Sequence, residues 1–516
     1  MIAYYRALVV PRKIDAPGSV ANQKLNLWRS HVFYKASFLS LLALSLSLTV
    51  QAQVPLNQIS TDPFMSPIGG QHSTEVEAAT NSNGSTIVSI FQEGRFYSNG
   101  GSVDNGYATS TNSGATWTTG SLPGITVNGG GGGIYDRCSD PSVVYDAAHR
   151  IWLAESLPLY ANLGATSPML VSRATDGIHW GTPVTVGPVY NRPDKTWLNC
   201  DNSTISPYYG TCYAEWDDNS AGDIIYFATS NDGGQTWGSP VQPSGGPAMF
   251  GANALTQPNG FVIAAAADAF DLNIQATTSA DGGKTFTSPA TVSVITKHTP
   301  SGGVRTLVLP SGAIDANGKY FVFWADCSFR AGCTSNDIVF STSTNGVTWS
   351  KLNRVPIDKL TSPSDHFLPG VTIEAGTGGA SAHIGLMYYY YANGNCLANC
   401  KLQAGYISSL NGGSTWSAPT VLTPTMNLPW LASTTLGKMV TDFGAVSFSN
   451  GKAFPMVAYA TAKVGTAWHE SMNTVVTGLV DKPGTLSAGH DFRFPNAVSD
   501  SPAPTRPVCD SCEDKD

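Results

Sequence analysis

The feature that most constrains this chain is an eight-residue phrase that recurs six times. Its clearest copies are SNDGGQTW at 230–237 and SADGGKTF at 279–286. The looser copies end at Trp117, Trp180, Trp349 and Trp416. The phrase therefore returns about every 60 residues, and self-similarity at so long a period predicts a fold built from repeated structural units.

Each copy of the phrase has the chemistry of a tight hairpin turn. Glycine supplies the positive φ that such a turn needs, and an Asp or Asn side chain caps it by accepting from nearby backbone N–H groups. The glycine and the final aromatic residue are kept, whereas the acid is replaced by Asn112, Thr175, Thr344 and Asn411. A catalytic carboxylate would not be replaced so freely, so the phrase is predicted to be structural.

The phrase resembles the Asp box, or BNR repeat, of sialidases and their relatives, and the resemblance spans roughly residues 71–480. The resemblance implies a β-propeller in which each box lies between the third and fourth strands of a blade. It implies a ligand site at the opposite face, where the innermost strands begin. The Arg-Ile-Pro motif of sialidases is missing from the first such strand, which reads HSTEVE at 72–77. No sialidase catalytic residue is therefore carried over.

The composition suits strands and turns. The 516 residues include 53 Gly and 32 Pro, 10% are aromatic and only 12% are charged. The net charge is −8 without a basic cluster, which argues against nucleic acid as a partner. A propeller grows by adding blades as one unit, so one large domain is expected, and it is expected to be a monomer.

The N-terminal segment has the pattern of an export signal. Basic residues precede the apolar run 38–48, and Ala52 fits the small-residue rule for cleavage. The run is short for a membrane span, so residues 1–52 are expected to be a removed signal peptide, with an uncleaved anchor as the alternative. Residues 1–28 are long for the start of such a signal, which leaves open a start further downstream. The mature protein is expected to be secreted or periplasmic, with no membrane span.

Cysteine usage agrees with export. In an exported protein, closely spaced pairs are typical of small disulfides that staple loops. The pairs are Cys200 with Cys212, Cys327 with Cys333, Cys396 with Cys400, and Cys509 with Cys512. Cys138 is left without a partner in this scheme.

Seven segments have the pattern of innermost strands. They begin at Glu75, Asp140, Trp197, Gly251, Arg305, Leu368 and Asp442. The last unit lacks a box, so a strand near 54–59 is expected to complete it and close the ring, which removes exposed sheet edges. The predicted fold class is therefore all-β, a propeller of seven four-stranded blades over 53–485, with six blades as the alternative. The Pro-rich residues 486–516 are expected to form a flexible tail.

Charged residues are scarce, yet many of them stand where innermost strands are expected to begin. Ring closure would bring them into one funnel, where crowded carboxylates raise one another's pKa and prepare a general acid. Glycosidases place two carboxylates across the bond that they break. The predicted catalytic residues are Asp140, Asp365, Glu75 and Asp442. The predicted substrate-binding residues are Arg305, Arg137, His366 and Trp197.

Each of these candidates has a plainer interpretation. Asp140 precedes a proline, so its alternative role is to cap a turn. The alternative for Arg305 is an ordinary salt bridge, and the alternative for Trp197 is a position in the hydrophobic core. The acidic clusters at 201–203 and 217–219 are typical of turns, with a calcium site as the alternative. No cofactor is predicted.

The sequence thus favours a secreted propeller that acts on extracellular glycans, by glycoside hydrolysis with funnel carboxylates. The alternative is a non-catalytic propeller of the cell envelope that binds a glycan or a protein. A third hypothesis is an assembly propeller with no small ligand.

Overall fold

The structure is a computed structural model that describes residues 54–64, 68–161, 167–190, 192–397 and 399–487. Contacts divide the chain into two compact units, Met1–Gln51 and Ala52–Asp516, and all described residues belong to the second. The expected signal peptide, most of the expected tail and the pair Cys509 and Cys512 lie outside the described residues.

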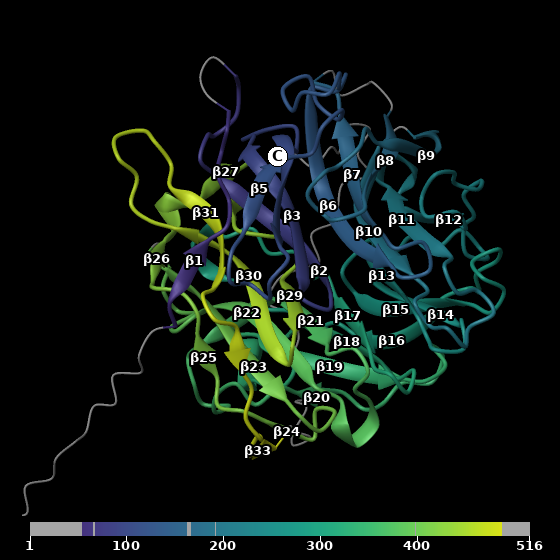
Figure 1. Ribbon diagram of the computed structural model, residues 1–516. Helices are drawn as coiled ribbons and strands as arrows, with labels where there is room; N and C mark the ends of the chain where they lie inside the picture. The colour runs from purple at the N-terminus through teal and green to yellow at the C-terminus, as the bar shows by residue number, and fades with distance from the viewer. Residues whose placement is uncertain (1–53, 65–67, 162–166, 191, 398, 488–516) are drawn as a thin grey trace, which may run out of the picture. The chain divides into compact units, whose positions relative to one another are not determined.

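The regular structure of the described residues is almost entirely strand, which confirms the all-β prediction, and the strands form successive antiparallel meanders (Figure 1). The first meander comprises β2 (Glu75–Asn83), β3 (Thr86–Arg95), β4 (Ser102–Ser110) and β5 (Thr118–Ser121). The second comprises β6 (Arg137–Asp146), β7 (Ile151–Leu159), β8 (Ser167–Ala174) and β9 (Val184–Tyr190). The third comprises β10 (Pro193–Cys200), β11 (Cys212–Asp218) and β12 (Ile224–Ser230). The fourth comprises β13 (Phe250–Thr256), β14 (Val262–Ala267), β15 (Asn273–Ser279) and β16 (Ala290–Val294).

Three more meanders complete the series. The fifth comprises β17 (Ser311–Ile314), β18 (Tyr320–Asp326), β19 (Asp337–Ser343) and β20 (Asn353–Arg354). The sixth comprises β21 (Asp365–Ile373), β22 (Ile384–Tyr391), β23 (Lys401–Ser409), β25 (Thr420–Val421) and β26 (Met426–Asn427). The seventh comprises β29 (Ala445–Ser449), β30 (Lys452–Ala460), β31 (Glu470–Val475), β32 (Leu479–Val480) and β1 (Leu56–Gln58).

Short elements connect the meanders. Two small ladders pair β24 (Thr415–Trp416) with β33 (Leu486–Ser487), and β27 (Ala432–Thr434) with β28 (Gly437–Met439). The described helices are single 3-10 turns, η1 (Asn219–Ala221), η2 (Ser301–Gly303), η3 (Ala331–Cys333), η4 (Gly379–Ser381) and η5 (Leu428–Trp430). No helix among the described residues is long and apolar enough to cross a membrane.

The first strands of the meanders lie against one another in cyclic order. β2 contacts β6, β6 contacts β10, and the series continues through β13, β17 and β21 to β29, which contacts β2 again. Backbone N–H groups of one first strand donate to side chains of the preceding one, as Leu198 does to Ser142 at 2.9 Å and Val371 does to Ser311 at 3.0 Å. These bonds fix neighbouring meanders at their inner edges.

The N-terminal strand joins the seventh meander, as expected. β1 pairs antiparallel with β31, with Leu56 opposite Val475 and Gln58 opposite Asn473. The next residue, Ile59, is 1% exposed and donates its N–H to Met472 O at 2.9 Å. The N-terminal strand β1 therefore lies in the same sheet as β29, β30 and β31, which come late in the chain.

The recurring phrase lies between the third and fourth strands wherever a fourth strand is present. In the copy at 230–237, Asp232 Oδ1 accepts from Thr236 N at 3.0 Å, and Asp232 Oδ2 accepts from Thr236 Oγ1 at 2.6 Å. Asn112 and Asn411 accept the corresponding backbone bonds in their copies. The turn is capped as the sequence predicted.

Two copies require a correction. The capping residues there are Asp176, which accepts from the N–H groups of residues 178 and 179, and Asn345, which accepts from those of residues 347 and 348. The phrase alone had predicted Thr175 and Thr344 at the capping position, and that prediction is wrong. These two turns carry one residue fewer between cap and aromatic, so the cap moves one position along the chain.

The prediction that the fifth innermost strand begins at Arg305 is also wrong, because that strand, β17, begins at Ser311. The segment 305–307 lies ahead of β17, and Arg305 N donates to Lys438 O at 2.7 Å, so it pairs with β28. Pro310, which has no N–H to donate to a ladder, directly precedes β17. The expected first strand begins after this proline.

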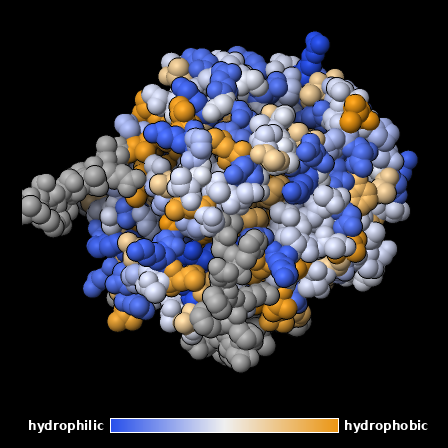
Figure 2. All heavy atoms as spheres, turned by 90° about the horizontal axis from the view of Figure 1, so that it is seen from below, coloured by the Kyte–Doolittle hydropathy of each residue, from blue (hydrophilic) through white to orange (hydrophobic). Residues whose placement is uncertain are grey.

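The hydrophobic core is divided among the spaces between neighbouring meanders. Leu153 of β7 and Trp216 of β11 share one cluster, and Phe323 of β18 and Leu386 of β22 share another. Trp216 is fully buried and packs as a core residue. Seen from below, the hydrophobic residues of the surface lie scattered among hydrophilic ones (Figure 2).

Three of the four expected disulfides are present. They join Cys200 to Cys212, Cys327 to Cys333, and Cys396 to Cys400. Cys138 is a free, buried thiol, in agreement with its lack of a partner in the sequence scheme.

Candidate functional site

Five of the first strands share one backbone irregularity. Their pairing with the second strand shifts at corresponding places, as in a β-bulge. One residue at each bulge has φ between 41° and 63°. These residues are Glu77, Asp140, Lys195, Gly251 and Leu368. Only glycine adopts this left-handed conformation freely, and each other residue pays of order 1–3 kcal/mol, a strain that clusters at functional sites.

The bulges lead into a buried ion cluster. Lys195 Nζ lies 3.0 Å from Asp442 Oδ2, 3.2 Å from Asp194 Oδ1 and 3.6 Å from Asp140 Oδ2. Arg305 donates to both oxygens of Asp442, from Nε at 2.8 Å and from Nη2 at 2.7 Å. The lysine, the arginine and Asp442 are each at most 2% exposed. Side chains far apart in the sequence thus form one charged network.

Asp140 is held in this network from several sides. Ser139 Oγ donates to its Oδ1 at 2.8 Å, and Lys195 N donates to its Oδ2 at 2.9 Å. Thr196 Oγ1 donates to the backbone carbonyl of Asp140 at 2.6 Å. These partners belong largely to the neighbouring first strand, so the carboxylate links two strands and does not cap a local turn.

Glu77 is a member of the site that sequence reasoning did not select. Its Oε2 accepts from Gln92 Nε2, and its Oε1 has no hydrogen-bond partner among the described residues. Burial, and then the charges of Asp140 and Asp442, raise the pKa of Glu77 well above its ordinary value. This rise favours the protonated form of Glu77, which is the form that a general acid needs.

Asp442 has the opposite charge state. Burial alone would raise the pKa of Asp442, but the Arg305 guanidinium and the Lys195 ammonium outweigh burial and hold that pKa far below its usual range. Asp442 is therefore a permanent carboxylate that orients the two cations, and it has no proton to donate. Since the bidentate pair occupies the Nε and Nη2 donors of Arg305, the salt bridge weighed as the alternative for this arginine is present.

A cavity of about 190 Å³ runs along the first strands beside this cluster. Glu77, Asp140 and Thr196 line it near the bulges, together with Trp197 and Phe443, whose rings lie 6.1 Å apart. Later residues of all seven first strands line the remainder. Of the sequence-predicted residues, Asp140 and Trp197 line the cavity, and Asp442 and Arg305 belong to the network beside it.

The structure places the other predicted residues in different surroundings. Asp365 Oδ1 accepts from Asn336 N at 2.8 Å, and its Oδ2 lies 3.1 Å from His298 Nδ1. His366 is buried and packs beside the rings of Tyr388 and Tyr390. The contacts of Asp365 and His366 are made around β19, β21 and β22, away from the ion cluster.

Arg137 and Glu75 also lie apart from the ion cluster. Arg137 Nη1 donates to the carbonyl of Ser98 at 2.6 Å, and its guanidinium stacks on Phe96 at 3.8 Å from the ring centroid. Glu75 Oε2 accepts from Ser60 Oγ at 3.0 Å. Burial and the nearby charge of Asp62 raise the pKa of Glu75 to about 8.

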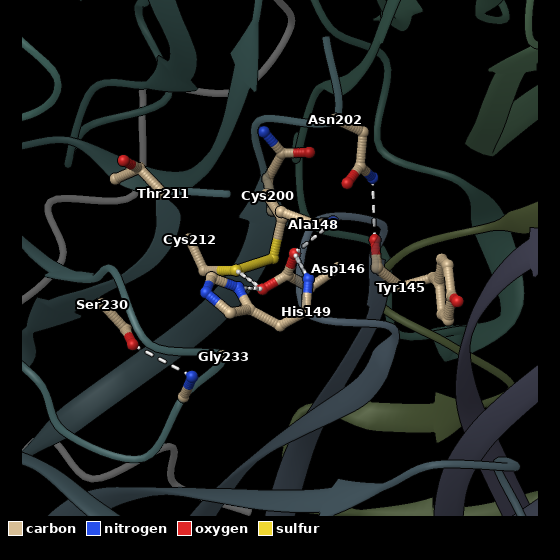
Figure 3. Close-up of a disulfide and its surroundings, with 12 residues drawn as sticks. Tyr145, Asp146, Ala148, His149, Cys200, Asn202, Thr211, Cys212, Ser230 and Gly233 are labelled. Atoms are coloured by element: carbon tan, nitrogen blue, oxygen red, sulfur yellow. Dashed lines mark hydrogen bonds and ion pairs between the residues drawn. A yellow bond between two sulfur atoms is a disulfide. The ribbon is translucent and has the colours of Figure 1, made fainter. Parts of the chain in front are cut away.

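Two groups of side chains have the spacing of metal ligands, but their atoms are already engaged. One group contains Asp146, Cys200 and Cys212, whose sulfurs are joined in a disulfide beside the Asp146 carboxylate and the His149 ring (Figure 3). The other contains Asp337, Asp358 and His366. There the guanidinium of Arg330 lies 2.5 Å from Asp337 and 2.7 Å from Asp358. Arg330 thus pairs with both carboxylates of the second group.

The acidic cluster at 201–203 is a turn. Asp201 Oδ1 accepts from Ser203 N at 3.0 Å, and Asp201 Oδ2 accepts from Ser206 Oγ at 2.5 Å. These local bonds are those of a capped turn, which was the favoured interpretation of the sequence.

Comparison of the sequence with protein-family models finds no match, and comparison with curated proteins finds no relative. Solved structures with some likeness include a protein of unknown function from Dyadobacter fermentans, 14% identical, which covers 69% of this chain and 99% of that chain with a TM-score of 0.43. A Hadza microbial sialidase is 12% identical and covers 72% of this chain and 74% of its own chain, with a TM-score of 0.42. An alpha-L-arabinofuranosidase from Fusarium graminearum is 12% identical and covers 66% of this chain and 92% of its own chain, with a TM-score of 0.41. Likeness at this level assigns neither a family nor an activity.

Proposed function

We propose that the seven meanders are the blades of a seven-bladed β-propeller with Asp-box turns. Three features support the proposal: the cyclic contacts of the first strands, the pairing of β1 with β31, and the six capped turns. The cavity lined by every first strand would then be the central channel. The three disulfides agree with the proposal that the protein is secreted or periplasmic.

We propose further that this propeller acts on glycans, with its site where Glu77 and Asp140 line the channel. The observation that carries the proposal is the set of strained bulges that bring two carboxyl groups to one cavity. One of them, Glu77, has a raised pKa, and the other, Asp140, is fixed by Lys195. Glycoside hydrolysis needs such a pair on either side of the scissile bond. Glu77 would protonate the leaving oxygen, and Asp140 would act as the base or nucleophile.

The remaining members of the site would position the reacting pair. Asp442 fixes Arg305 and Lys195, and Lys195 in turn orients Asp140. Trp197 offers a ring face to a sugar at the cavity wall. The cavity is smaller than the ~300–1,000 Å³ of pockets that enclose drug-sized ligands, so it would admit only a terminal sugar unit. The proposed enzyme would therefore be exo-acting and would release sugars from the ends of glycan chains.

A panel of aryl glycosides and natural polysaccharides, incubated with the purified mature protein, tests this function. Reducing-end release from at least one substrate is expected, and the Asp140→Asn variant should lose about 100-fold or more of that rate. Release that Asp140→Asn leaves unchanged would contradict the assignment.

A binding propeller is the second candidate, favoured by the burial and internal neutralisation of Arg305 and Lys195. Glycan binding without turnover, weakened by Trp197→Ala and unchanged by Asp140→Asn, would establish that alternative in place of hydrolysis.

A further inference from the structure

Two lysines meet one tryptophan next to the β27–β28 hairpin. Lys438 belongs to β28, while Lys463 and Trp468 belong to the connection between β30 and β31. Lys463 Nζ lies 2.8 Å from the centroid of the indole ring, and Lys438 Nζ lies 5.6 Å from the same centroid. Lys438 Nζ is also bonded to Ser433 Oγ at 2.5 Å. Both ammonium groups thus lie within cation–π range of one aromatic ring.

The positive charges of this pair are not neutralised by an acidic partner. Among the described residues, no carboxylate lies within ion-pair distance of either ammonium group. Burial lowers the pKa of Lys438, and burial together with the charge of Lys438 lowers the pKa of Lys463. Two like charges held together without a counter-ion favour an anion between them.

The acid nearest to the pair does not supply that anion. Glu470 is 1% exposed, its Oε2 accepts from Ala432 N at 2.6 Å, and its Oε1 has no hydrogen-bond partner among the described residues. Burial, followed by the charge of Glu75, raises the pKa of Glu470 well above its usual value. The raised pKa favours the protonated form of Glu470, and its carboxyl group makes no ion pair with either lysine among the described residues.

The backbone connects this lysine pair to the proposed channel site. Lys438 O accepts from Arg305 N at 2.7 Å, and Val440 O accepts from Glu77 N at 3.0 Å. The short segment 438–442 therefore carries Lys438 at one end and Asp442 of the ion cluster at the other. Beside the lysines, Leu436 and Val464 are 44% and 72% exposed, so the surface around the pair is open to solvent.

We propose that Lys438, Lys463 and Trp468 form a subsite for the oxyanion group of an anionic glycan, a sulfate ester or a carboxylate. The two ammonium groups would bind the oxyanion, and Trp468 would hold them at the required spacing. The inference rests on the proposed function only in taking the ligand to be a glycan. The subsite binds the charged group and takes no part in bond cleavage.

Binding to three immobilised polymers tests the subsite: heparin, which carries sulfate esters, polygalacturonic acid, which carries carboxylates, and dextran, which is neutral. The probe variant is the double substitution Lys438→Met and Lys463→Met, which keeps the aliphatic stems. The matched control is Lys351→Met, because Lys351 is an exposed lysine at a distant turn. Tm measurements establish that each variant is folded.

At low salt, wild type and the Lys351→Met control should bind at least one anionic polymer at least about tenfold more tightly than the double variant does. Which polymer it is identifies the oxyanion. Equal binding by the double variant, an equal loss in the control, or no binding of either anionic polymer by wild type would overturn the subsite. The proposed hydrolysis is measured separately on neutral aryl glycosides, whose turnover the double variant should leave unchanged.

Discussion

At the scale of single residues, the unusual property of this protein is the number of carboxyl groups that it buries. Glu93, Glu155 and Glu215 are at most 1% exposed, and burial raises the pKa of each well above its ordinary value. A group of this kind favours the folded state while it is protonated. Its stabilising effect is complete below the unfolded pKa of about 4.5 and is lost as the pH rises through the folded value.

Glu155 offers the clearest test of this effect, because neither of its carboxylate oxygens has a hydrogen-bond partner among the described residues. Replacing Glu155 by Gln removes the charge and keeps the size of the side chain. The Tm at pH 8 is expected to rise by about 2 °C or more, and the Tm at pH 4.5 should stay nearly the same. A Tm that falls equally at both pH values would show that Glu155 is ionised and paired.

Asp232 tests the structural role of the repeated turns. Burial opposes its charge, but the hydrogen bonds from Thr236, Ser230 and Gln235 together outweigh burial and lower the pKa of Asp232 to about 2. Asp232→Ala should cost about 1 kcal/mol in urea unfolding, as the loss of a capping group does. Activity per folded molecule should not change. An inactive variant with wild-type stability would contradict the division between turns and site.

Sequence reasoning selected part of the proposed site at this scale. Asp140, Asp442 and Arg305 could be selected because they are charged residues near expected strand starts in a chain poor in charge. Glu77 was not selected from the sequence; Glu75 was chosen from the same segment instead. Only the left-handed bulge, which no residue pattern marks, puts Glu77 into the cavity.

At the scale of elements, the C-terminal segment is fastened to the sixth meander by one histidine. His383 Nδ1 lies 2.8 Å from Glu374, and its Nε2 lies 2.7 Å from Asp481, which also accepts from Tyr406 at 2.7 Å. Burial would lower the pKa of His383, but the bonds and charges of Asp481 and Glu374 outweigh burial and raise it. β33 then pairs with β24 a few residues further along the chain.

This fastening is expected to depend on pH. The pKa of His383 is raised in the folded state, so the stabilisation is fully present below its unfolded value of about 6.5 and is lost as the pH rises through the folded value. His383→Gln should therefore cost about 1–2 kcal/mol at pH 6 and much less at pH 9. His383→Gln should also speed protease cleavage of the segment after residue 475, more at pH 6 than at pH 9. Equal losses at the two pH values would indicate a purely steric role.

Strands were more predictable than their connections. Alternation and β-branched residues located most first strands and the N-terminal strand that completes the last sheet. The approach of Arg305 to β28 depends on a contact between segments more than a hundred residues apart, and local patterns carry no information about it. For the same reason, the contacts of Asp365 and His366 away from the ion cluster could not be foreseen.

At the scale of the whole molecule, the account depends on closure of the ring by β1. A protein lacking residues 53–59 should lose cooperative unfolding and aggregate, because β31 would become an exposed edge. The matched control lacks residues 488–516, which the sequence marks as a tail, and should unfold like the full-length protein. If removal of 53–59 left the Tm unchanged, the ring would not need β1.

The central claim is that one protonated carboxyl in the channel, Glu77, acts on a glycan. The most direct test compares kcat/KM of Glu77→Gln and Glu155→Gln on a substrate that the wild type hydrolyses. Both substitutions remove the ionisable group of a buried glutamate whose pKa burial raises, but only Glu77 lines the cavity. We predict a loss of about 100-fold or more for Glu77→Gln and little change for Glu155→Gln, with both variants folded. Equal rates in the two variants would contradict the account.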